Sequence, residues 1–383
     1  MNPDTLFMEK ALKMAFSSVG ITSPNPPVGA VIVKNNKIIG SGSTSTFGGN
    51  HAEVNAINSC TESTEDSVMY VTLEPCCHFG KTPPCTMAII AAKIKKVVIA
   101  AIDPNPLVCG KGILELENAG IETIIDKKNG SFARELLEPF KTYLEEKRPY
   151  IVHKAAMTLD GCTASHNKDS KWITSESSRA LSHRLRSVVD AVIVGKGTYI
   201  VDDPRLDVRN EYLDNKKVNV YSNESFLFSE LISNDFEVKK RTPLRVLAGF
   251  PDRFENRSFF YDDNYLIFCS ESDHDCDIPE YVDREKIIPI GFSGKKFIEK
   301  MLKILYDQGV MFAMVEGGAR LNASFHEAVL PDSYLYFFAP KVLGGGHPLF
   351  KGSGEEMIKN SRTVNHKALA LIDGDLAVYG EFK

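Results

Sequence analysis

Four residues in the first quarter of the chain have the side chains and the spacing of a catalytic zinc site. They are His51, Glu53, Cys76 and Cys85. A neutral imidazole and two thiolates give zinc three ligands and leave one position for water, whose pKa falls to about 7 on such a metal. We therefore predict that His51, Cys76 and Cys85 bind zinc. Glu53 lies in the same helical turn as His51, where it can take the proton of that water and pass it to a leaving amine.

The spacing of these residues follows the signature of zinc-dependent deaminases, His-x-Glu and then Pro-Cys-x-x-Cys, with one departure. In this chain a longer loop separates Cys76 from Cys85. Such a loop can line a substrate pocket. Its last residues, 82–84, are Thr-Pro-Pro and predict a helix start, whose free backbone N–H groups favour the thiolate of Cys85.

A structural zinc site, or ordinary buried cysteines, is the alternative interpretation. Cys77 or His78 would then supply a fourth ligand, because structural zinc sites are closed by four protein ligands. Such a site would have no use for Glu53, and this residue favours the catalytic interpretation. A spectroscopic count of the zinc ligands would separate the two.

Alternating helices and strands are predicted to position these residues. Apolar runs and turn residues predict a β-hairpin at 28–40 and strands at 68–73 and 97–101, with helices that open near His51 and Cys85 between them. Strand and helix in turn predict helices packed on a central sheet. The segment 103–106, Asp-Pro-Asn-Pro, follows a strand, where ligands bind in open α/β sheets, although alone it is more often a turn.

Composition limits the classes of protein to which the chain can belong. Its 383 residues and 43% hydrophobic content predict two or three domains with sizeable cores. A net charge of -5 provides no broad basic surface and argues against nucleic-acid binding. The eight cysteines suggest a reducing compartment. Because no signal peptide or long apolar run is present, we expect a soluble, cytoplasmic protein that does not bind membranes.

A charged segment that ends in proline marks a domain boundary. The predicted helix 131–147 ends in Glu-Glu-Lys, and Arg148 and Pro149 follow. An apolar run at 150–157 then opens a new sheet. We predict one domain at 1–147 and a second at 148–383.

The second half carries polar residues suited to a phosphorylated ligand. The segment 154–161 runs from a strand into a turn, and Trp172 precedes a helix that carries Arg179, His183 and Arg186. Arg186 and Arg209 are predicted to clamp a phosphate, because the planar guanidinium can form paired hydrogen bonds with phosphate oxygens. The alternatives are a solvated charge for each arginine and a core position for the tryptophan.

A second candidate for phosphate binding lies near residue 317. The predicted strand 310–315 runs into Glu316-Gly317-Gly318, and a helix follows. Glycines at this place allow a phosphate to approach the helix N-terminus, where backbone N–H groups and the helix dipole favour an anion. The dinucleotide-binding fingerprint Gly-x-Gly-x-x-Gly is absent, and two adjacent glycines alone are weak evidence.

Several motifs of the first half resemble the deaminase half of the bifunctional riboflavin-biosynthesis deaminase–reductases. They are Asn25-Pro26-Pro27-Val28-Gly29, His51-Ala52-Glu53, Glu74-Pro75-Cys76, Gly80-Lys81-Thr82-Pro83-Pro84-Cys85 and Asp103-Pro104-Asn105. The long loop ending in Thr-Pro-Pro-Cys is the specific feature. The resemblance implies a cytidine-deaminase-like α/β/α domain and substrate contacts from Asn25, His78, Lys81, Thr82, Asp103 and Asn105. One position departs, because Thr44 stands where the family often has a histidine seven residues before the zinc histidine.

The second half is similar to the reductase half of the same family. The resemblance implies a dihydrofolate-reductase-like α/β fold and the cofactor NADPH. It implies NADPH contacts from Ala156, Trp172, Thr198, Asp202, Gly318, Ala319, Arg320, Leu321, Asn322, Ala323 and Ser324. It implies substrate contacts from Ser170, Arg186, Leu206, Arg209 and Glu316. Residues 210–241 depart from the family and are interpreted as a surface insertion. Gly249 stands where the family usually has an aspartate, so the resemblance implies no contact at that position.

The resemblance implies a two-step enzyme that acts on small phosphoribosylaminopyrimidines. Zinc-dependent hydrolytic deamination of a diaminopyrimidinone ribosyl phosphate is followed by NADPH-dependent reduction of the ribosyl group to ribityl. Lys154 and Asp202 are the candidates for the proton donor in the second step. A homo-oligomer, either a dimer or a tetramer, is expected.

Two other functions are compatible with the zinc motif. One is a tRNA or nucleoside deaminase fused to an unrelated domain, against which the long loop between Cys76 and Cys85 and the absence of a basic surface both count. The other is a zinc-stabilised protein without catalysis that binds a nucleotide for regulation. Glu53 makes this second function improbable, and ammonia release with and without a chelator would test it.

Overall fold

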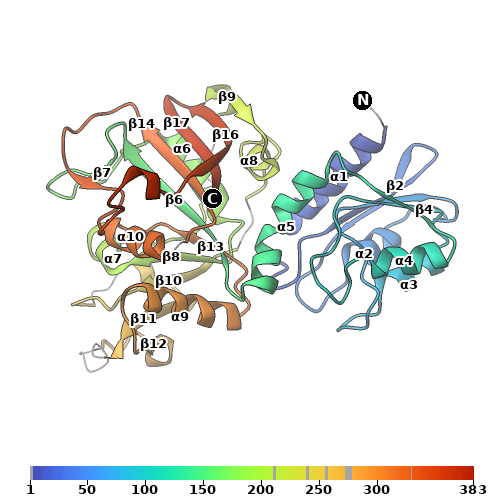
Figure 1. Ribbon diagram of the computed structural model, residues 1–383, viewed down its shortest axis with the longest axis horizontal. Helices are drawn as coiled ribbons and strands as arrows, with labels where there is room; N and C mark the ends of the chain where they lie inside the picture. Colours follow the sequence, from blue (N-terminus) through green and yellow to red (C-terminus); the bar gives the residue numbers. More distant parts are fainter. Residues whose placement is uncertain (1–2, 210–212, 239–240, 255–257, 272–277, 329) are drawn as a thin grey trace. The chain divides into compact units, whose positions relative to one another are not determined.

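The chain folds into two compact units, Met1–Lys147 and Arg148–Lys383. The computed structural model describes residues 3–209, 213–238, 241–254, 258–271, 278–328 and 330–383. Both units are built from helices packed on a sheet (Figure 1), so the predicted α/β fold class is confirmed. None of the described helices is both long enough and apolar enough to cross a membrane.

The first unit is a five-stranded sheet between two layers of helices. Its elements are α1 (Pro3–Ser18), β1 (Gly29–Lys34), β2 (Lys37–Ser43), α2 (Ala52–Asn58), β3 (Val68–Val71), α3 (Cys85–Ala91), β4 (Lys96–Ile99), α4 (Lys111–Asn118), β5 (Glu122–Ile125) and α5 (Gly130–Glu145). The strand order is β2-β1-β3-β4-β5. Helices α1 and α5 contact each other on one face, and α2, α3 and α4 lie on the other (Figure 1).

The direction of the strands brings the segments of Cys76 and Asp103 to one edge of this sheet. The β1–β2 hairpin turns through Asn35 and Asn36, whose φ values of 49° and 59° suit asparagine in a tight hairpin turn. Strands β3, β4 and β5 run parallel to one another. Because β3 and β4 are parallel, the segments that follow them begin at the same edge, and these segments carry Cys76 and Asp103.

The second unit contains a ten-stranded mixed sheet. Its elements are β6 (Tyr150–Thr158), β7 (Cys162–Ala164), α6 (Glu176–Arg186), β8 (Ala191–Gly195), α7 (Lys196–Asp202), η1 (Asn215–Lys217), β9 (Val218–Asn223), α8 (Phe226–Leu231), β10 (Leu244–Ala248), η2 (Ser258–Phe260), β11 (Tyr265–Ser270), η4 (Arg284–Lys286), β12 (Ile287–Ile290), α9 (Gly294–Asp307), β13 (Phe312–Val315), α10 (Ala319–Glu327), β14 (Ser333–Ala339), β15 (His347–Pro348), η5 (Ile358–Asn360), β16 (Val364–Ile372) and β17 (Asp375–Phe382). The strand order is β12-β11-β10-β8-β13-β6-β14-β17-β16-β9. The strands from β12 to β14 are parallel, and the remaining pairs are antiparallel.

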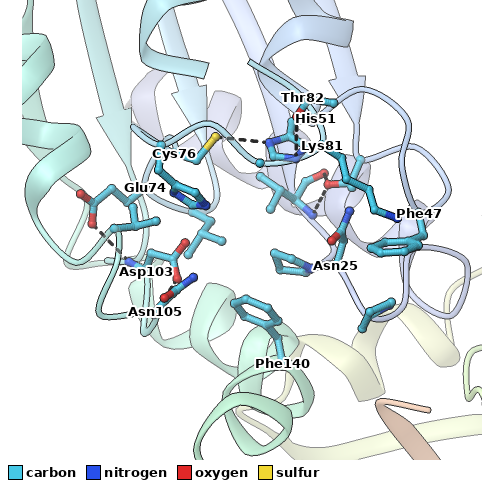
Figure 2. A pocket seen from close by; sticks show the side chains of 18 of the residues that line it. Asn25, Phe47, His51, Glu74, Cys76, Lys81, Thr82, Asp103, Asn105 and Phe140 are labelled. Carbon is cyan, nitrogen blue, oxygen red and sulfur yellow. Dashed lines mark hydrogen bonds between the residues drawn. The ribbon is translucent and has the colours of Figure 1, made fainter. Parts of the chain in front are cut away.

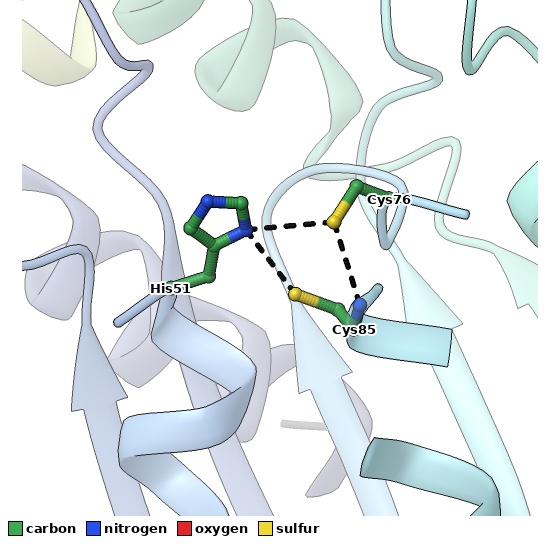
Figure 3. Close-up of side chains that lie close together, drawn as sticks. All are labelled: His51, Cys76 and Cys85. Atoms are coloured by element: carbon green, nitrogen blue, oxygen red, sulfur yellow. Dashed lines mark hydrogen bonds between the residues drawn. The ribbon is translucent and has the colours of Figure 1, made fainter. Parts of the chain in front are cut away.

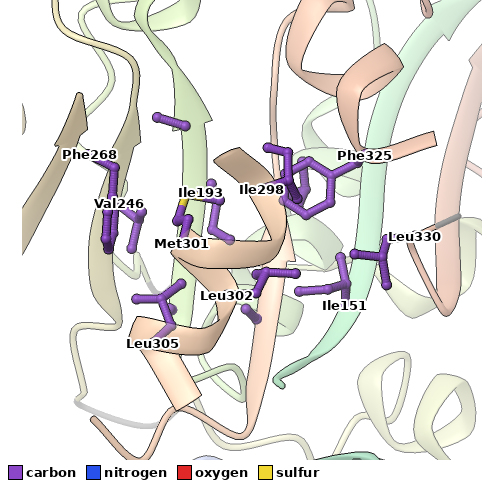
Figure 4. Close-up of a cluster of buried hydrophobic side chains, with 14 of the residues drawn as sticks. Ile151, Ile193, Val246, Phe268, Ile298, Met301, Leu302, Leu305, Phe325 and Leu330 are labelled. Atoms are coloured by element: carbon purple, nitrogen blue, oxygen red, sulfur yellow. The ribbon is translucent and has the colours of Figure 1, made fainter. Parts of the chain in front are cut away.

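Helix α9 supplies one side of the core of this unit. Its apolar residues recur with the helical period and pack on the sheet beside α10 (Figure 4). Ile298, Met301, Leu302 and Leu305 are at most 1% exposed. Each such burial contributes about 1.5–3 kcal/mol, so this face fixes α9 and the neighbouring strand β13.

The predicted surface insertion is in part a structural element of the second unit. Residues 210–212 and 239–240 lie outside the described part of the chain. Between them β9 pairs with β16 at the edge of the sheet, and Phe228 of α8 is fully buried. The guanidinium of Arg184 donates hydrogen bonds to the carbonyls of Leu231 and Ser233 at 2.8 and 2.9 Å. The prediction is therefore wrong for α8, because its apolar side chains pack into the unit.

Candidate functional site

The three predicted zinc ligands lie together in the first unit (Figure 3). His51 precedes α2, Cys76 lies in the loop after β3, and Cys85 is the first residue of α3. His51 Nδ1 is 3.2 Å from Cys85 Sγ and 3.5 Å from Cys76 Sγ. All three ligand atoms lie within 4.8 Å of one another. One imidazole nitrogen and two sulfurs are a donor set that suits zinc.

The neighbouring residues do not close this group. Among the described histidine, cysteine and acidic residues, neither Cys77 nor His78 joins the three ligand atoms. The backbone N–H of Cys85 donates to Cys76 Sγ at 3.4 Å, as expected where a helix begins at a thiolate. A hydrogen bond from the Cys85 side chain lowers the pKa of Cys76, and the same bond raises the pKa of Cys85. The fit is therefore to a three-ligand site with an open position.

Glu53 is buried beside this group, in the first turn of α2. Its side chain is only 3% exposed. Burial, assisted by the charge of Cys76 and opposed by His51, raises the pKa of Glu53 to about 7. A carboxyl group with such a pKa can both accept and release a proton near neutral pH.

A cavity of about 360 Å³ adjoins two of the three ligand residues (Figure 2). Its lining includes the predicted metal ligands His51 and Cys76, and Glu53. It also includes all six residues for which the resemblance implied substrate contacts, namely Asn25, His78, Lys81, Thr82, Asp103 and Asn105. Burial raises the pKa of Asp103 to about 6, although the backbone N–H of Asn105 opposes the change. The structure thus gathers in one cavity residues that lie up to eighty positions apart in the sequence.

Aromatic side chains of the cavity were not predicted from the sequence. Phe140, Tyr143 and Leu144 of α5 line it, and Phe140 faces Asn105 and Asn25 across the cavity in Figure 2. Phe47 lies at another wall, with the ammonium of Lys81 3.8 Å from the centre of its ring. The sequence does predict the helix that carries Phe140. The apolar stripe of that helix does not reveal which of its residues reach a site formed by other elements.

Thr44, which replaces the family's histidine, also lines the cavity. It is 4% exposed, and its hydroxyl accepts a hydrogen bond from the backbone N–H of Val28 at 3.1 Å. Thr44 therefore links the start of β1 to the end of β2. Unlike a histidine, its side chain cannot ionise in the cavity near neutral pH.

The second unit contains a buried cluster of charges around Glu316. The guanidinium of Arg186 contacts the Glu316 carboxylate through Nη2 at 2.8 and 3.1 Å and through Nε at 3.1 Å. Arg186 Nη1 also donates to the carbonyl of Asp207 at 2.7 Å. Lys154 Nζ lies 3.9 Å from Glu316. Burial lowers the pKa of Lys154, and Glu316 opposes this change.

The two arginines of the predicted phosphate clamp lie in different environments. Arg186 is 8% exposed and is held by Glu316, whereas the side chain of Arg209 is 53% exposed. Arg209 Nε donates to Asp207 at 3.1 Å, and its backbone N–H donates to His183 at 3.3 Å. Asp207 therefore contacts both arginines, through its carbonyl and its carboxylate. Leu206, the preceding residue, is buried and has a φ of 55°.

The residues implied for NADPH lie on several elements. Ala156 is on β6, Thr198 and Asp202 are on α7, and Gly318 to Ser324 form the start of α10. A Cβ atom at Gly318 would come within 3.2 Å of Thr198 Oγ1, so the backbone approaches this hydroxyl closely. Ser170 donates a hydrogen bond to Asp202 at 2.9 Å.

Trp172 is also among the residues implied for NADPH. It is 66% exposed rather than part of the core, and the guanidinium of Arg179 lies 4.3 Å from the centre of its ring. Gly318 offers no side-chain cap to α10, and an exposed aromatic ring such as that of Trp172 is a surface on which a ligand ring can stack.

Comparison with known proteins shows the family of the chain. The family model for the cytidine and deoxycytidylate deaminase zinc-binding region matches residues 1–101, and the one for the RibD C-terminal domain matches residues 149–371. The riboflavin biosynthesis protein RibD of Aquifex aeolicus is 37% identical over 376 residues, which cover 98% of each chain. The chain belongs to the RibD family. It is a deaminase and a reductase of riboflavin biosynthesis, with zinc and NADPH as cofactors.

Other members of the RibD family agree in sequence and in fold. RibD of Escherichia coli is 34% identical and covers 89% of each chain. A solved diaminohydroxyphosphoribosylaminopyrimidine deaminase/5-amino-6-(5-phosphoribosylamino)uracil reductase of Thermotoga maritima is 32% identical, covers 100% of this chain and 99% of its own, and gives a TM-score of 0.82. RibD of Acinetobacter baumannii is 30% identical with the same coverage and a TM-score of 0.79. The predicted family and the two activities are confirmed.

Proposed function

We propose that the first unit, 1–147, is the deaminase and that the second unit, 148–383, is the reductase. The proposed first substrate is 2,5-diamino-6-ribosylamino-4(3H)-pyrimidinone 5′-phosphate, and the second step reduces the ribosyl group of its deaminated product to ribityl. The observation that carries the first assignment is the group of His51, Cys76 and Cys85, because His51 and Cys76 line one cavity together with the buried Glu53. Both steps act on molecules with the same phosphate tail, which is consistent with one chain that carries both activities.

In the deaminase, His51, Cys76 and Cys85 are assigned as the metal ligands and Glu53 as the general acid and base. Zinc, when bound, supplies a Lewis acid that lowers the pKa of water. Glu53 accepts a proton from the attacking water and returns it to the departing ammonia. Its pKa of about 7 supports this role, because the free energies of its two protonation states are then nearly equal at neutral pH.

The other polar residues of the cavity are assigned to binding and orientation of the substrate. Asn25, Asp103 and Asn105 carry amide and carboxyl groups suited to the polar edge of a pyrimidine. Lys81, His78 and Thr82 lie on the loop between the two cysteine ligands. We assign the ammonium of Lys81 to the phosphate tail, because its position over Phe47 holds a positive charge at the wall of the cavity.

In the reductase, the charged cluster and the start of α10 are assigned to substrate and cofactor. NADPH, when bound, supplies the hydride for C1′ of the sugar, and its assigned contacts are Ala156, Trp172, Thr198, Asp202 and Gly318 to Ser324. Ser170, Arg186, Leu206, Arg209 and Glu316 are assigned to the substrate. Lys154 remains the first candidate for the proton donor, because it lies beside Glu316 and burial lowers its pKa. Burial raises the pKa of Asp202, the second candidate.

The experiment that tests the proposal supplies the diaminopyrimidinone phosphate with and without NADPH. Ammonia and NADPH absorbance are recorded separately. We expect ammonia in both reactions. In the reaction that contains NADPH, we also expect the NADPH absorbance to fall. Absence of ammonia release would contradict the assignment of the first unit, and ammonia release without NADPH oxidation would contradict that of the second.

We also propose that the chain forms a homo-oligomer, a dimer or a tetramer, in the cytoplasm. Leu114 of α4 and Ile124 and Ile125 of β5 expose apolar surface at an edge of the first sheet, which supports association. None of the described cysteines forms a disulfide, which supports a reducing compartment. Light scattering would give the oligomeric state, and a monomer at all concentrations would contradict the first part of this proposal.

A further inference from the structure

Glu74 is a buried carboxylate that lies two residues before Cys76, and its side chain is hydrogen-bonded to the segment of Asp103 (Figure 2). Its side chain is 2% exposed. Its own N–H donates to the carbonyl of Ala101 at 2.9 Å, which fixes it beside the end of β4. Its carboxylate accepts hydrogen bonds from the N–H groups of Asp103 at 3.3 Å, Gly110 at 2.9 Å, Gly112 at 3.0 Å and Ile113 at 3.3 Å.

These donors belong to the loop after β4 and to the first turn of α4. Gly110 precedes α4 with a φ of 80°, and Gly112 and Ile113 lie inside its first turn. The N–H groups of a first helical turn have no partner within the helix, and they favour a negative charge. The carboxylate of Glu74 therefore provides the acceptors that this helix start requires.

The same carboxylate holds both ends of the loop 103–110. Oε2 accepts from Asp103 at one end and from Gly110 at the other. Within the loop, Oδ1 of Asp103 accepts from the N–H of Asn105 at 2.8 Å, and Oδ1 of Asn105 accepts from the N–H of Leu107 at 3.0 Å. Because Asp103 and Asn105 line the cavity, the position of Glu74 sets the position of two groups that face the substrate.

The segment of Glu74 is also tied to the metal-binding side of the cavity. A Cβ atom at Gly112 would come within 2.1 Å of the carbonyl oxygen of Pro75, so α4 packs directly on the backbone that leads to Cys76. Thr86 of α3 donates its N–H to the carbonyl of Cys76 at 3.2 Å and its hydroxyl to Glu115 of α4 at 3.0 Å. The metal ligand and the loop 103–110 are therefore held by one network.

We propose that Glu74 is a positioning residue for deamination, which sets Asp103 and Asn105 at a fixed place relative to the metal ligands. This inference rests on the proposed function of the cavity. It predicts that the loss of one acceptor oxygen displaces the loop and with it Asp103 and Asn105, which line the cavity together with Glu74. A displacement of about 1 Å caused by a mutation away from the chemistry can cost roughly 100-fold in rate.

The test is Glu74→Gln in the full chain, because glutamine has the same shape but turns an NH2 group toward backbone N–H donors. We expect KM for the diaminopyrimidinone phosphate to rise by about tenfold or more, with zinc content and NADPH-dependent reduction of the deaminated substrate unchanged. Glu117→Gln is the matched control, since Glu117 is an exposed carboxylate on α4. Unchanged deamination in Glu74→Gln would overturn the proposal.

A second measurement separates positioning from general support of the fold. If Glu74 acts through Asp103 and Asn105, then Glu74→Gln should add little to the KM of a chain that carries both Asp103→Ala and Asn105→Ala, whereas independent effects would multiply. Multiplied effects would overturn the proposal.

If Glu74→Gln loses zinc or fails to fold, Glu74→Asp decides, because it keeps the charge but shortens the reach. A raised KM with zinc retained supports the proposal, and normal KM or loss of zinc overturns it. Failure of the unmodified chain to release ammonia would instead contradict the proposed function.

Discussion

The guanidinium of Arg186 and the carboxylate of Glu316 form a bidentate ion pair inside the second unit, with Nη2 2.8 Å from Oε1. The two residues lie 130 positions apart in the sequence. Arg186 ends α6, and Glu316 follows β13. Their side chains are 10% and 14% exposed. Because water solvates each charge only in part, each charge depends on its partner for neutralisation. Removal of one partner would therefore have a larger effect than removal of an exposed charge.

Arg186→Ala is expected to destabilise the second unit by about 3 kcal/mol, because it leaves the buried Glu316 carboxylate without its main partner. Urea unfolding of the full chain, followed by circular dichroism, measures this change. A loss below about 1 kcal/mol would show that the pair contributes no more than a surface salt bridge.

Arg209→Ala is expected to leave stability within about 1 kcal/mol but to raise the reductase KM for the phosphorylated substrate, because its half-exposed guanidinium can reach a ligand. Arg205→Ala is the matched control, since Arg205 also pairs with Asp207 and its side chain is 48% exposed. Equal KM values for the two variants and the unmodified chain would remove Arg209 from the phosphate contacts.

The stability of the second unit should depend on pH through Glu316. Burial alone would raise its pKa, but the charges of Arg186 and Lys154 lower it from 4.5 to about 2. Since the folded state binds the proton less readily than the unfolded state, the contribution of Glu316 is fully present above pH 4.5 and is lost as the pH falls through about 2. The difference in free energy of unfolding between the unmodified chain and Glu316→Gln should therefore shrink between these values. A difference that grows on acidification would contradict this sign.

Glu53→Gln is expected to keep zinc and to lower the rate of deamination by at least about 100-fold, the effect usual for loss of a general acid and base. NADPH-dependent reduction in the same chain should be unchanged. Metal analysis, ammonia release and NADPH absorbance give the three quantities. Glu65→Gln serves as a control, because Glu65 is exposed and pairs only with the exposed Lys93 among the described ion pairs. Ammonia release near the normal rate would refute the role of Glu53.

Removal of the metal should abolish deamination and leave reduction intact. A chelator takes away zinc, and Cys85→Ser takes away one of its three proposed ligands, whereas the charged cluster around Glu316 contains none of them. Reduction is measured with the deaminated substrate, so that it does not depend on the first step. Cys109→Ser is the matched control, since Cys109 is an exposed thiol outside the three-ligand group. Persistent ammonia release by the metal-free chain would contradict the zinc assignment.

The sequence alone determined the donor set and the local elements. The types and spacing of His51, Glu53, Cys76 and Cys85 are enough to predict a metal with an open position, because ligand chemistry depends on side-chain type. The Asn35-Asn36 turn and the helix start before Cys85 were also predictable. Each depends on backbone preferences within a few residues, which the local sequence records.

Tertiary structure decided which distant side chains meet. Phe140 lines the cavity because α5 packs on the sheet beside it, and Arg186 pairs with Glu316 because α6 and the end of β13 converge. An apolar stripe reveals that a helix is buried, but not which residues lie at its end against a cavity. The burial of Phe228 inside the expected surface insertion has the same origin. Contacts across long sequence separations depend on how whole elements pack, and no local pattern encodes that packing.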